Sequence, residues 1–427
     1  MKEELKKSLR TYGALLLLGV TGVPLGAAVG LIEALFCRLL LKVTAIRVAH
    51  LFWCLPFLAM AGLVIVAVNQ KFGGRGKGGM SLIFDVAYEE ETELPLCMIP
   101  LAMLSTALTH LFGGSAGREG VAVQIGAVFS YFAGKKLPFK NAPGIFLVTG
   151  MAAGFAGMFG TPIAAVIFAV EVLAAGEMRY EALLPAFTAS FSASAVASLL
   201  GIRKENLAVH ISESLTPFLL VRLITLGIIF GITGGLFAWC LKHTKKYLGE
   251  KIKNPLFRSK CFSIGVILSI LFLLLYRGRY CGFGTNLVEA VFHGEKVYAY
   301  DWALKFILTI LTLSAGFQGG EVTPLFTIGA TLGAVLGNLF GIPVELSAAL
   351  GYAAVFGGYF HRRRDFWLRL SAIFLYCLHR GLRIQPQQLD LFPPETDEIQ
   401  LLITETSQSY HTPLRVTVHW CPANCNI

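Results

Sequence analysis

The stretch GGSAGREGVAVQIGA, residues 113–127, places Arg118 and Glu119 between glycines and directly before an apolar run. A second stretch, GGEVTPLFTIGA at residues 319–330, resembles it. Counted from Gly117 in the first and Gly319 in the second, Glu is the third residue of both, and both end in Ile-Gly-Ala. They lie about 200 residues apart, a spacing typical of transporters built from two related halves. The repeat therefore predicts that the chain has two such halves.

Long apolar runs surround both stretches. The 427 residues are 55% hydrophobic and only 15% charged, whereas soluble domains carry about 25% charged residues. A run of about 20 apolar residues spans a bilayer, and one such run could instead be the core of a soluble domain. Because this chain has several, the sequence predicts an all-α polytopic membrane protein. The runs are residues 12–41, 51–68, 94–112, 145–159, 219–241, 262–276 and 302–317.

Lys and Arg are concentrated in a few segments between these runs, and the net charge is +10. The segments are residues 2–10, 71–77, 135–140 and 242–260. Cytoplasmic segments of membrane proteins are enriched in such residues, so we expect the N-terminus and the three loops on the cytoplasmic side of the inner (plasma) membrane. This distribution favours a membrane orientation signal over a nucleic-acid-binding surface.

Three glycine-rich loops lead into apolar segments, at residues 73–84, 114–126 and 319–326. The free amides at a helix N-terminus bind anions, and glycine lets the backbone turn toward the ion. The short apolar segments 121–132, 162–174 and 324–337 are typical of half-helices that begin within the membrane. Together these features predict an anion site made mainly of backbone amides.

Glu119 is the expected gating and proton-carrying residue of this site. When ionised it can occupy the anion's place, and when protonated it can leave. Anion movement would thereby be coupled to proton movement. The alternative is an acid that only stabilises the start of a helix. Between membrane segments, an ionisable side chain is more often functional.

With these residues in view, the chain resembles the CLC family of chloride channels and anion/proton antiporters. The resemblance rests on GREG and VQIG at residues 117–126, GGEVTP at 319–324 and FGTPIAAVIFAVEV at 159–172. It implies a fold of two inverted repeats with broken, re-entrant helices. It also implies Glu119 as the gate, and a homodimer if the C-terminal helices are intact.

Several residues resemble the fluoride-exporting branch of that family. Chloride-handling members usually read GSGIP in the first loop, where this chain has Met80 in place of the coordinating serine. They usually read GREGP, where this chain has Val121. The resemblance implies fluoride/proton antiport, with Val322 and Thr323 beside the ion path. Core packing of Met80 and a helix cap at Thr323 are the alternatives. The expected anion-binding residues are Met80, Gly120, Val121, Val322 and Thr323, and the expected loop residues are Gly78, Gly79, Gly117, Arg118, Gly319, Gly320 and Pro324.

Composition divides the chain into a cytoplasmic N-terminus (1–11), a transmembrane domain (12–358) and an atypical tail (359–427). The transmembrane halves are expected at about 12–200 and 215–358. Of the 45 glycines, 44 precede residue 359, and the tail holds five of the eight glutamines. The tail is interpreted as a cytoplasmic extension or as the product of a frameshift near Gly358. In the second case the chain would be an inactive member of the family.

Other functions are weighed against fluoride transport. A chloride/proton antiporter or a voltage-gated-type chloride channel would share the fold. An intramembrane enzyme using His110, Ser115 or Glu119 would be a different class. The sequence has no HExxH metal motif and no G-x-S-x-G nucleophile elbow, so no enzyme, metal site or cofactor is expected. The expected partners are fluoride or chloride, protons and the lipid bilayer, and no nucleic acid.

Overall fold

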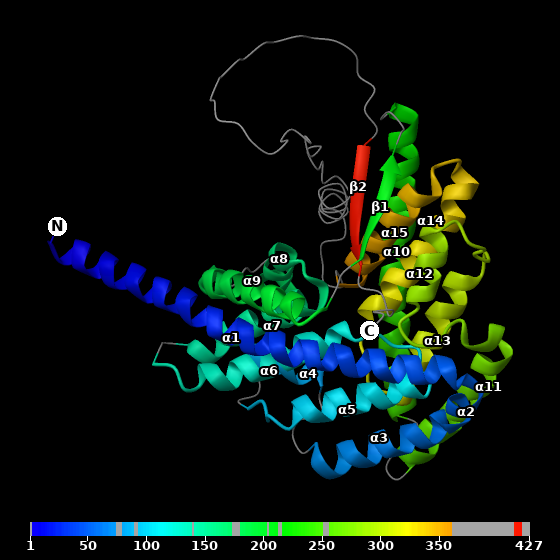
Figure 1. Ribbon diagram of the computed structural model, residues 1–427, viewed down its shortest axis with the longest axis horizontal. Coiled ribbons are helices and arrows are strands. Elements are labelled where there is room, and N and C mark those ends of the chain that lie inside the picture. The colour runs from blue at the N-terminus through cyan, green and yellow to red at the C-terminus, as the bar shows by residue number, and fades with distance from the viewer. Residues whose placement is uncertain are drawn as a thin grey trace, which may run out of the picture.

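The computed structural model describes residues 2–73, 79–88, 93–138, 141–172, 180–202, 205–211, 216–250, 256–360 and 414–420. Most of them are helical, as the apolar runs predict (Figure 1). The helices of the first half are α1 (Lys2–Ala49), α2 (Leu51–Cys54), η1 (Leu55–Phe57), α3 (Leu58–Phe72), α4 (Met80–Ala87), α5 (Met98–Leu111), α6 (Glu119–Gly134), α7 (Ala142–Phe159), α8 (Pro162–Val172), η3 (Tyr180–Ala182) and α9 (Leu183–Leu199). Those of the second half are α10 (Pro217–Glu250), α11 (Leu256–Leu274), η4 (Tyr276–Gly278), α12 (Thr285–Phe292), α13 (Asp301–Ala315), α14 (Val322–Phe340) and α15 (Val344–Phe360).

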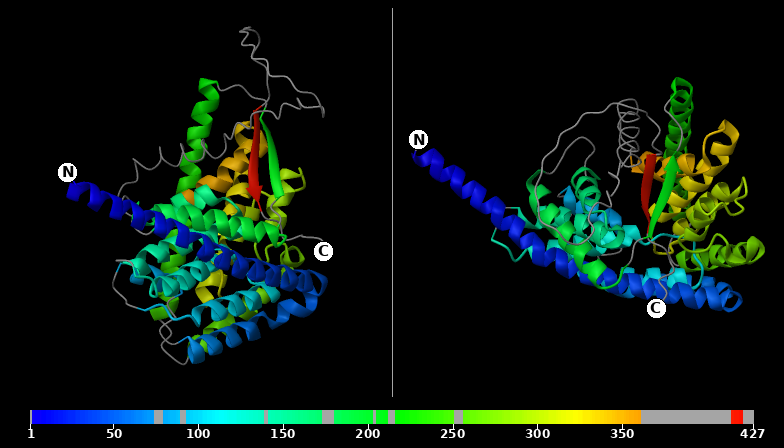
Figure 2. Two further views of the ribbon diagram at one scale, coloured as in Figure 1. Left: turned by 60° about the vertical axis from the view of Figure 1, so that its left-hand side comes forward. Right: turned by 45° about the horizontal axis from the view of Figure 1, so that its top comes forward.

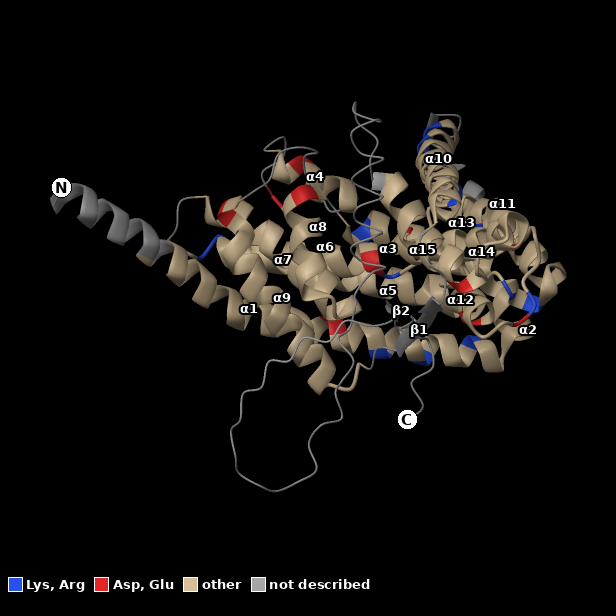
Figure 3. Cartoon of the chain, turned by 90° about the horizontal axis from the view of Figure 1, so that it is seen from above, with Lys and Arg blue, Asp and Glu red and all other residues tan. Residues whose placement is uncertain are grey.

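Six helical segments in the described ranges are long and apolar enough to cross a membrane. In the most apolar 18-residue stretch of each segment, 83% of the residues are buried in α7 and 78% in α14. The corresponding shares are 39% in α1 and 33% in α10. The outer helices expose large apolar side chains such as Leu16, Val20, Ile232 and Trp239. Charged residues are sparse on the helices (Figure 3). This distribution suits a protein whose outer surface contacts lipid. The six segments are Leu15–Ala49, Leu51–Phe72, Ala142–Phe159, Tyr180–Leu199, Pro217–Leu248 and Val322–Phe340.

The two halves repeat the same helix–helix contact. Helices α6–α9 gather on one side of Figure 1 and α12–α15 on the other. A Cβ atom on Gly126 of α6 would lie 2.1 Å from the carbonyl oxygen of Gly150 in α7. A Cβ on Gly329 of α14 would lie 2.0 Å from that of Gly351 in α15. Gly126 and Gly329 are the glycines of the repeated Ile-Gly-Ala. The repeat therefore marks a position where each half needs a close approach of two backbones.

The segments expected as half-helices are helical, with different ends. The segment expected at 121–132 is α6, which begins at Glu119, and the one expected at 324–337 is α14, which begins at Val322. Pro324 is the third residue of α14 rather than the first, and is tolerated because the first turn has no internal acceptor for its amide. With 19 residues, α14 is long enough to cross the membrane.

A pair of strands departs from the all-helical expectation. Strand β1 (Glu205–Ile211) lies between the two halves, and β2 (Leu414–Trp420) lies in the tail. They pair antiparallel from Glu205 opposite Trp420 to Ile211 opposite Leu414, and lie side by side in both views of Figure 2. Residues 361–413 and 421–427, on which the frameshift hypothesis mainly depends, lie outside the described residues. The domain boundary at residue 358 stays a prediction.

Candidate functional site

The glycine loops of the two halves meet in a short antiparallel bridge. The amide of Gly117 donates to the carbonyl of Gly320 at 2.5 Å, and the amide of Gly320 donates to the carbonyl of Gly117 at 2.8 Å. A Cβ on Gly320 would lie 2.8 Å from the amide nitrogen of Gly120, and one on Gly319 would lie 2.5 Å from the Cβ of Ala116. The glycines are therefore needed for this close approach. The bridge brings the N-termini of α6 and α14 together.

Glu119, the first residue of α6, lies across this junction and is 2% exposed. Its Oε2 accepts hydrogen bonds from the amide of Arg118 at 2.9 Å and from the amide of Thr323 at 3.2 Å. Its Oε1 accepts a hydrogen bond from the Thr323 hydroxyl. Thr323 lies in the first turn of α14, whose first amides have no partner within the helix. The Glu119 carboxylate thus occupies an anion position at the start of a helix from the other half.

The donors differ in part from those expected. The amides of Gly120 and Val121 were expected to face the anion, but no hydrogen bond between either amide and Glu119 occurs in the described structure. Val121 is 2% exposed and packs with Phe283 and Met158, whereas Val322 is 5% exposed and packs in another cluster with Phe326. Both valines therefore make the surroundings of the carboxylate apolar.

Arg118 is held beside the carboxylate by contacts that the sequence did not reveal. Its Nε lies 3.8 Å from Glu119 Oε1, and its Nη1 donates to the Sγ of Cys37 in α1 at 3.3 Å. The guanidinium lies 5.0 Å from the ring centroid of Phe283. A cation on an aromatic face is stabilised, most strongly where water is excluded. Arg118 therefore adds positive charge to the site from a fixed position.

His110 supports the same loop from α5. Its Nε2 lies 3.4 Å from the carbonyl oxygen of Gly117, and its ring centroid lies 4.2 Å from that of Phe283. The side chain is fully buried, and its Nδ1 has no hydrogen-bond partner. His110 is therefore a packing and loop-supporting residue, with one ring nitrogen free.

The segment that carries Phe283 is anchored by buried charges on α13. Lys305 donates to the carbonyls of Tyr280 at 3.1 Å and Gly282 at 2.7 Å, and is 0% exposed. Asp301 accepts from the Tyr280 hydroxyl at 2.5 Å and from Arg279 at 2.8 Å. A signal for these residues was present in the sequence, because Lys305 lies inside the apolar run 302–317.

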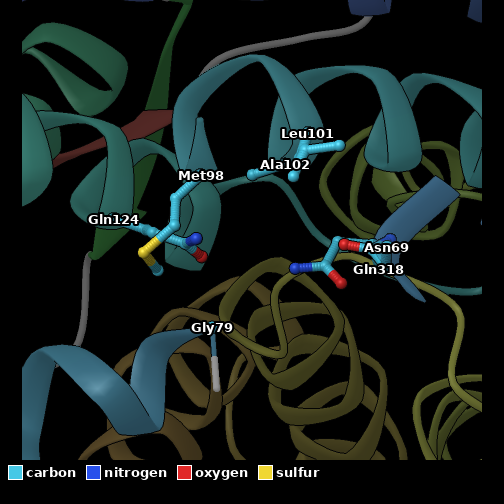
Figure 4. Close-up of a pocket in the computed structure, with 7 residues that line it drawn as sticks. All are labelled: Asn69, Gly79, Met98, Leu101, Ala102, Gln124 and Gln318. Carbon is cyan, nitrogen blue, oxygen red and sulfur yellow. The ribbon is translucent and has the colours of Figure 1, made fainter. Parts of the chain in front are cut away.

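The first glycine loop leads into α4 beside a cavity. Gly79 precedes α4 with φ 56°, a conformation that glycine adopts without strain. Met80, the first residue of α4, is half-buried and packs against the core of the first half. The cavity has a volume of about 250 Å³, part of it open to solvent. Gly78 lies outside the described residues. The cavity is lined by Asn69, Gly79, Met98, Leu101, Ala102, Gln124 and Gln318 (Figure 4).

Glu321, the counterpart of Glu119 in the second stretch, has a different environment. It precedes α14, and its Oε1 accepts a hydrogen bond from the Tyr359 hydroxyl at 2.5 Å. A Cβ on Gly117 would lie 3.0 Å from the Cδ of Pro324, so this proline packs closely against the bridge. The two repeated acids therefore face different partners.

Within the described ranges, no group of three or more His, Cys, Asp or Glu side chains could hold a metal ion.

Comparison with known proteins places this chain in a family. The sequence profile described as "Voltage gated chloride channel" matches residues 61–362. The "Chloride/fluoride channel protein" of Pseudomonas syringae pv. tomato is 33% identical over 352 residues, which are 81% of this chain and 76% of that protein.

Two solved structures of antiporters also superpose on this chain. A crystal structure of a "CLC-type fluoride/proton antiporter" superposes with a TM-score of 0.79 at 47% identity, covering 82% of this chain and 88% of that one. A slow cyanobacterial Cl⁻/H⁺ antiporter superposes with a TM-score of 0.64 at 19% identity, covering 86% and 92%, and shares the fold. The chain has the CLC-type fold of two inverted repeats and belongs to the voltage-gated chloride channel (CLC) family.

Proposed function

We propose that this protein exports fluoride by fluoride/proton antiport, with Glu119 as the gate that couples the two ions. The observation that carries the proposal is the position of the Glu119 carboxylate, which accepts hydrogen bonds from the amide and hydroxyl of Thr323 at the start of α14. These donors suit an anion of any kind. A fluoride ion and the ionised carboxylate would therefore compete for them.

Protonation changes the outcome of that competition. The ionised Glu119 is held by the Thr323 donors and by the nearby charge of Arg118. Once protonated, the carboxyl loses its charge and most of its attraction to these groups, because hydrogen bonds to charged groups are roughly twice as strong as neutral ones. Fluoride then takes the donors as Glu119 leaves with its proton. Glu119 releases this proton on the other side of the membrane, and the ionised carboxylate then returns to the donors and expels the fluoride.

The choice of fluoride over chloride rests on the relatives and on the donors. Two relatives described above are named for fluoride, one of them with chloride as well. Fluoride is small and strongly hydrated, so its site must replace tightly bound water. The Thr323 hydroxyl and amide can do so. Met80, where chloride-handling members have a serine, removes a donor suited to the larger ion.

The remaining assignments form part of this proposal. The expected membrane is the inner (plasma) membrane, with the N-terminus in the cytoplasm and the chain paired as a homodimer. The anion path is proposed to pass Met80, Gly120, Val121, Val322 and Thr323. The loops that form it are proposed to be those of Gly78 and Gly79, of Gly117 and Arg118, and of Gly319, Gly320 and Pro324.

Flux from liposomes tests the proposed substrate. The purified chain is reconstituted into liposomes loaded with fluoride or chloride, and efflux is followed with an ion-selective electrode. We expect fluoride efflux to be much faster than chloride efflux and to drive proton uptake. Equal rates for the two anions would favour a chloride-conducting member of the family. Normal incorporation with no flux of either anion would identify an inactive member.

A further inference from the structure

We propose that Glu33, a buried acid of α1, exchanges a proton with the gate, being protonated while Glu119 is ionised and ionised while Glu119 is protonated. This inference rests on the proposed role of Glu119 and adds a second proton-binding residue to it. Glu33 and Arg38 are the charged residues of the apolar run 12–41. Arg38 is exposed and donates to the carbonyl of Leu200, whereas Glu33 is enclosed by protein. An ionisable side chain enclosed at membrane depth is more often functional.

Glu33 is enclosed because α1 packs closely between α7 and α9 (Figure 1). The side chain is 1% exposed. A Cβ on Gly157 of α7 would lie 3.4 Å from the Cβ and Cγ of Glu33, and one on Gly30 of α1 would lie 2.6 Å from the carbonyl oxygen of Ala193 in α9. Neither carboxyl oxygen of Glu33 has a hydrogen-bond partner in the part of the chain that the structure describes. A carboxylate in such surroundings is costly unless a cation compensates its charge.

Arg118 is the cation that Glu33 and Glu119 share. Its Nη1 donates to the Sγ of Cys37 at 3.3 Å, and Cys37 is four residues after Glu33, on the same face of α1. The positive charge of Arg118 also acts on the Glu33 carboxyl. On its other side, the Nε of Arg118 lies 3.8 Å from Glu119 Oε1. The guanidinium therefore connects the gate with the part of α1 that carries Glu33.

Few other titratable groups lie on the helices packed against α1, which are α9, α7, α5, α6 and α2. The segments α7 and α9 carry none. The others carry Cys54 on α2, His110 on α5, and Glu119 and Tyr131 on α6. Among the groups that the structure describes, Arg118 is the one whose charge acts on Glu33. The ionisation of Glu33 therefore depends on where the charge of Arg118 is directed.

A single guanidinium cannot compensate two ionised carboxylates where water is excluded. While Glu119 is ionised, it lies beside Arg118 and on the Thr323 donors, and Glu33 keeps its proton. When Glu119 binds a proton and leaves, the negative charge beside Arg118 is lost, and Glu33 ionises to replace it. One O–H bond breaks at Glu33 as one forms at Glu119. When the ionised Glu119 returns, Glu33 takes up a new proton.

Infrared difference spectra of the purified full-length chain test the exchange, because a protonated carboxyl has a C=O band that an ionised one lacks. The spectra are recorded at pH 8, where Glu119 is expected to be ionised, in a maltoside detergent without ester carbonyls. Subtracting Glu33→Gln from the wild-type chain should reveal the band of a protonated Glu33. The same subtraction in a Glu119→Gln background, where the gate stays neutral, should show no such band.

Two results of this measurement would overturn the exchange. A band present in both backgrounds would mean that Glu33 stays protonated whatever the gate does. A band absent from both would mean that Glu33 is a fixed counter-charge of Arg118. If Glu33→Gln fails to fold, Glu33→Asp replaces it, because a shorter acid shifts the band instead of removing it.

Antiport in liposomes provides a second measurement. In Glu33→Gln, no negative charge at position 33 replaces that of Glu119 when the gate is protonated, so protonation of the gate becomes less favourable. We expect the pH of half-maximal fluoride/proton antiport to fall in Glu33→Gln and to return toward the wild-type value in Glu33→Asp. The matched control is Glu295→Gln, because Glu295 is exposed in the loop between α12 and α13 and its loss should leave the profile unchanged.

The outcomes separate Glu33 from the proposed function. A wild-type pH profile in Glu33→Gln, with antiport intact, overturns the role of Glu33 and leaves Glu119 as the gate. A wild-type chain without fluoride/proton antiport contradicts the proposed function. The infrared spectra then still decide whether Glu33 and Glu119 exchange a proton, because they require no transport.

Discussion

Glu119 and Thr323 are 204 residues apart in the sequence, yet the side chain of one caps the helix of the other. Each residue lies in the first turn of the helix that follows a glycine loop, one in each half of the chain. The proposed gate is therefore a contact between the two repeats. Changes on either side of this contact should affect transport.

Thr323→Val should make the gate easier to open. The hydroxyl stabilises the ionised, seated form of Glu119, so its loss favours the protonated form. A hydrogen bond to a charged group contributes about 1.5–3 kcal/mol. We expect the pH of half-maximal fluoride/proton antiport to rise in Thr323→Val and to stay near the wild-type value in Thr323→Ser. A profile unchanged in both variants would show that this hydrogen bond does not set the gate.

Gly117→Ala should disrupt the bridge between the loops. Its Cβ would lie 2.5 Å from Glu119 Oε2 and 3.0 Å from the carbonyl oxygen of Gly320, so the loop or the carboxylate must move. We expect a large loss of antiport measured per incorporated protein. Gly227→Ala in α10 is the control, because nothing lies within 4 Å of its added Cβ. Wild-type antiport in Gly117→Ala would contradict the importance of this close contact.

Gly329→Ala should destabilise the second half. The new Cβ would lie 2.0 Å from the carbonyl oxygen of Gly351, which is backbone and cannot move without separating α14 from α15. Overpacking of this kind costs about 1–3 kcal/mol. A lower thermal unfolding midpoint in detergent is expected. For Gly235→Ala, whose Cβ meets nothing within 4 Å, the midpoint should not fall. Equal midpoints for the two variants would argue against the helix contact as a source of stability.

Lys305→Met should loosen the segment that supports Arg118. The substitution removes the donor to two buried carbonyls, those of Tyr280 and Gly282, at a cost of about 1–3 kcal/mol for each unsatisfied group. Phe283, which belongs to this segment, contacts both Arg118 and His110. We expect a lower thermal midpoint and slower fluoride flux. A variant as stable and active as the wild type would show that Lys305 does not hold this segment.

Much of the fold could be predicted from the sequence because membrane helices need long apolar runs. The repeated Ile-Gly-Ala also predicted two halves, and the structure gives its glycines a shared role at Gly126 and Gly329. Helix starts were less predictable. Val121 and Pro324 were taken as first residues, but α6 and α14 begin two residues earlier, because first-turn amides need no partner within the helix. The β1–β2 pair was missed because it joins segments about 200 residues apart.

Of the residues predicted from the sequence for the candidate site, the structure brings Glu119 and Thr323 into contact, but only part of their surroundings was predictable. Glycine-rich loops pointed to Glu119 and Thr323, since both chemistry and spacing were visible in the sequence. The partners of Arg118 were not predictable, because Cys37 and Phe283 are brought to it only by packing of α1 and of the segment before α12.

The coupling of fluoride and proton movement in Glu119→Gln tests the central claim most directly. Liposomes containing wild-type or variant protein are loaded with fluoride, and fluoride efflux and proton uptake are recorded in the same sample. We predict that the wild-type chain takes up protons as fluoride leaves, and that Glu119→Gln abolishes proton uptake, since an amide cannot carry the proton. Proton-coupled fluoride efflux that persists unchanged in Glu119→Gln would contradict the account.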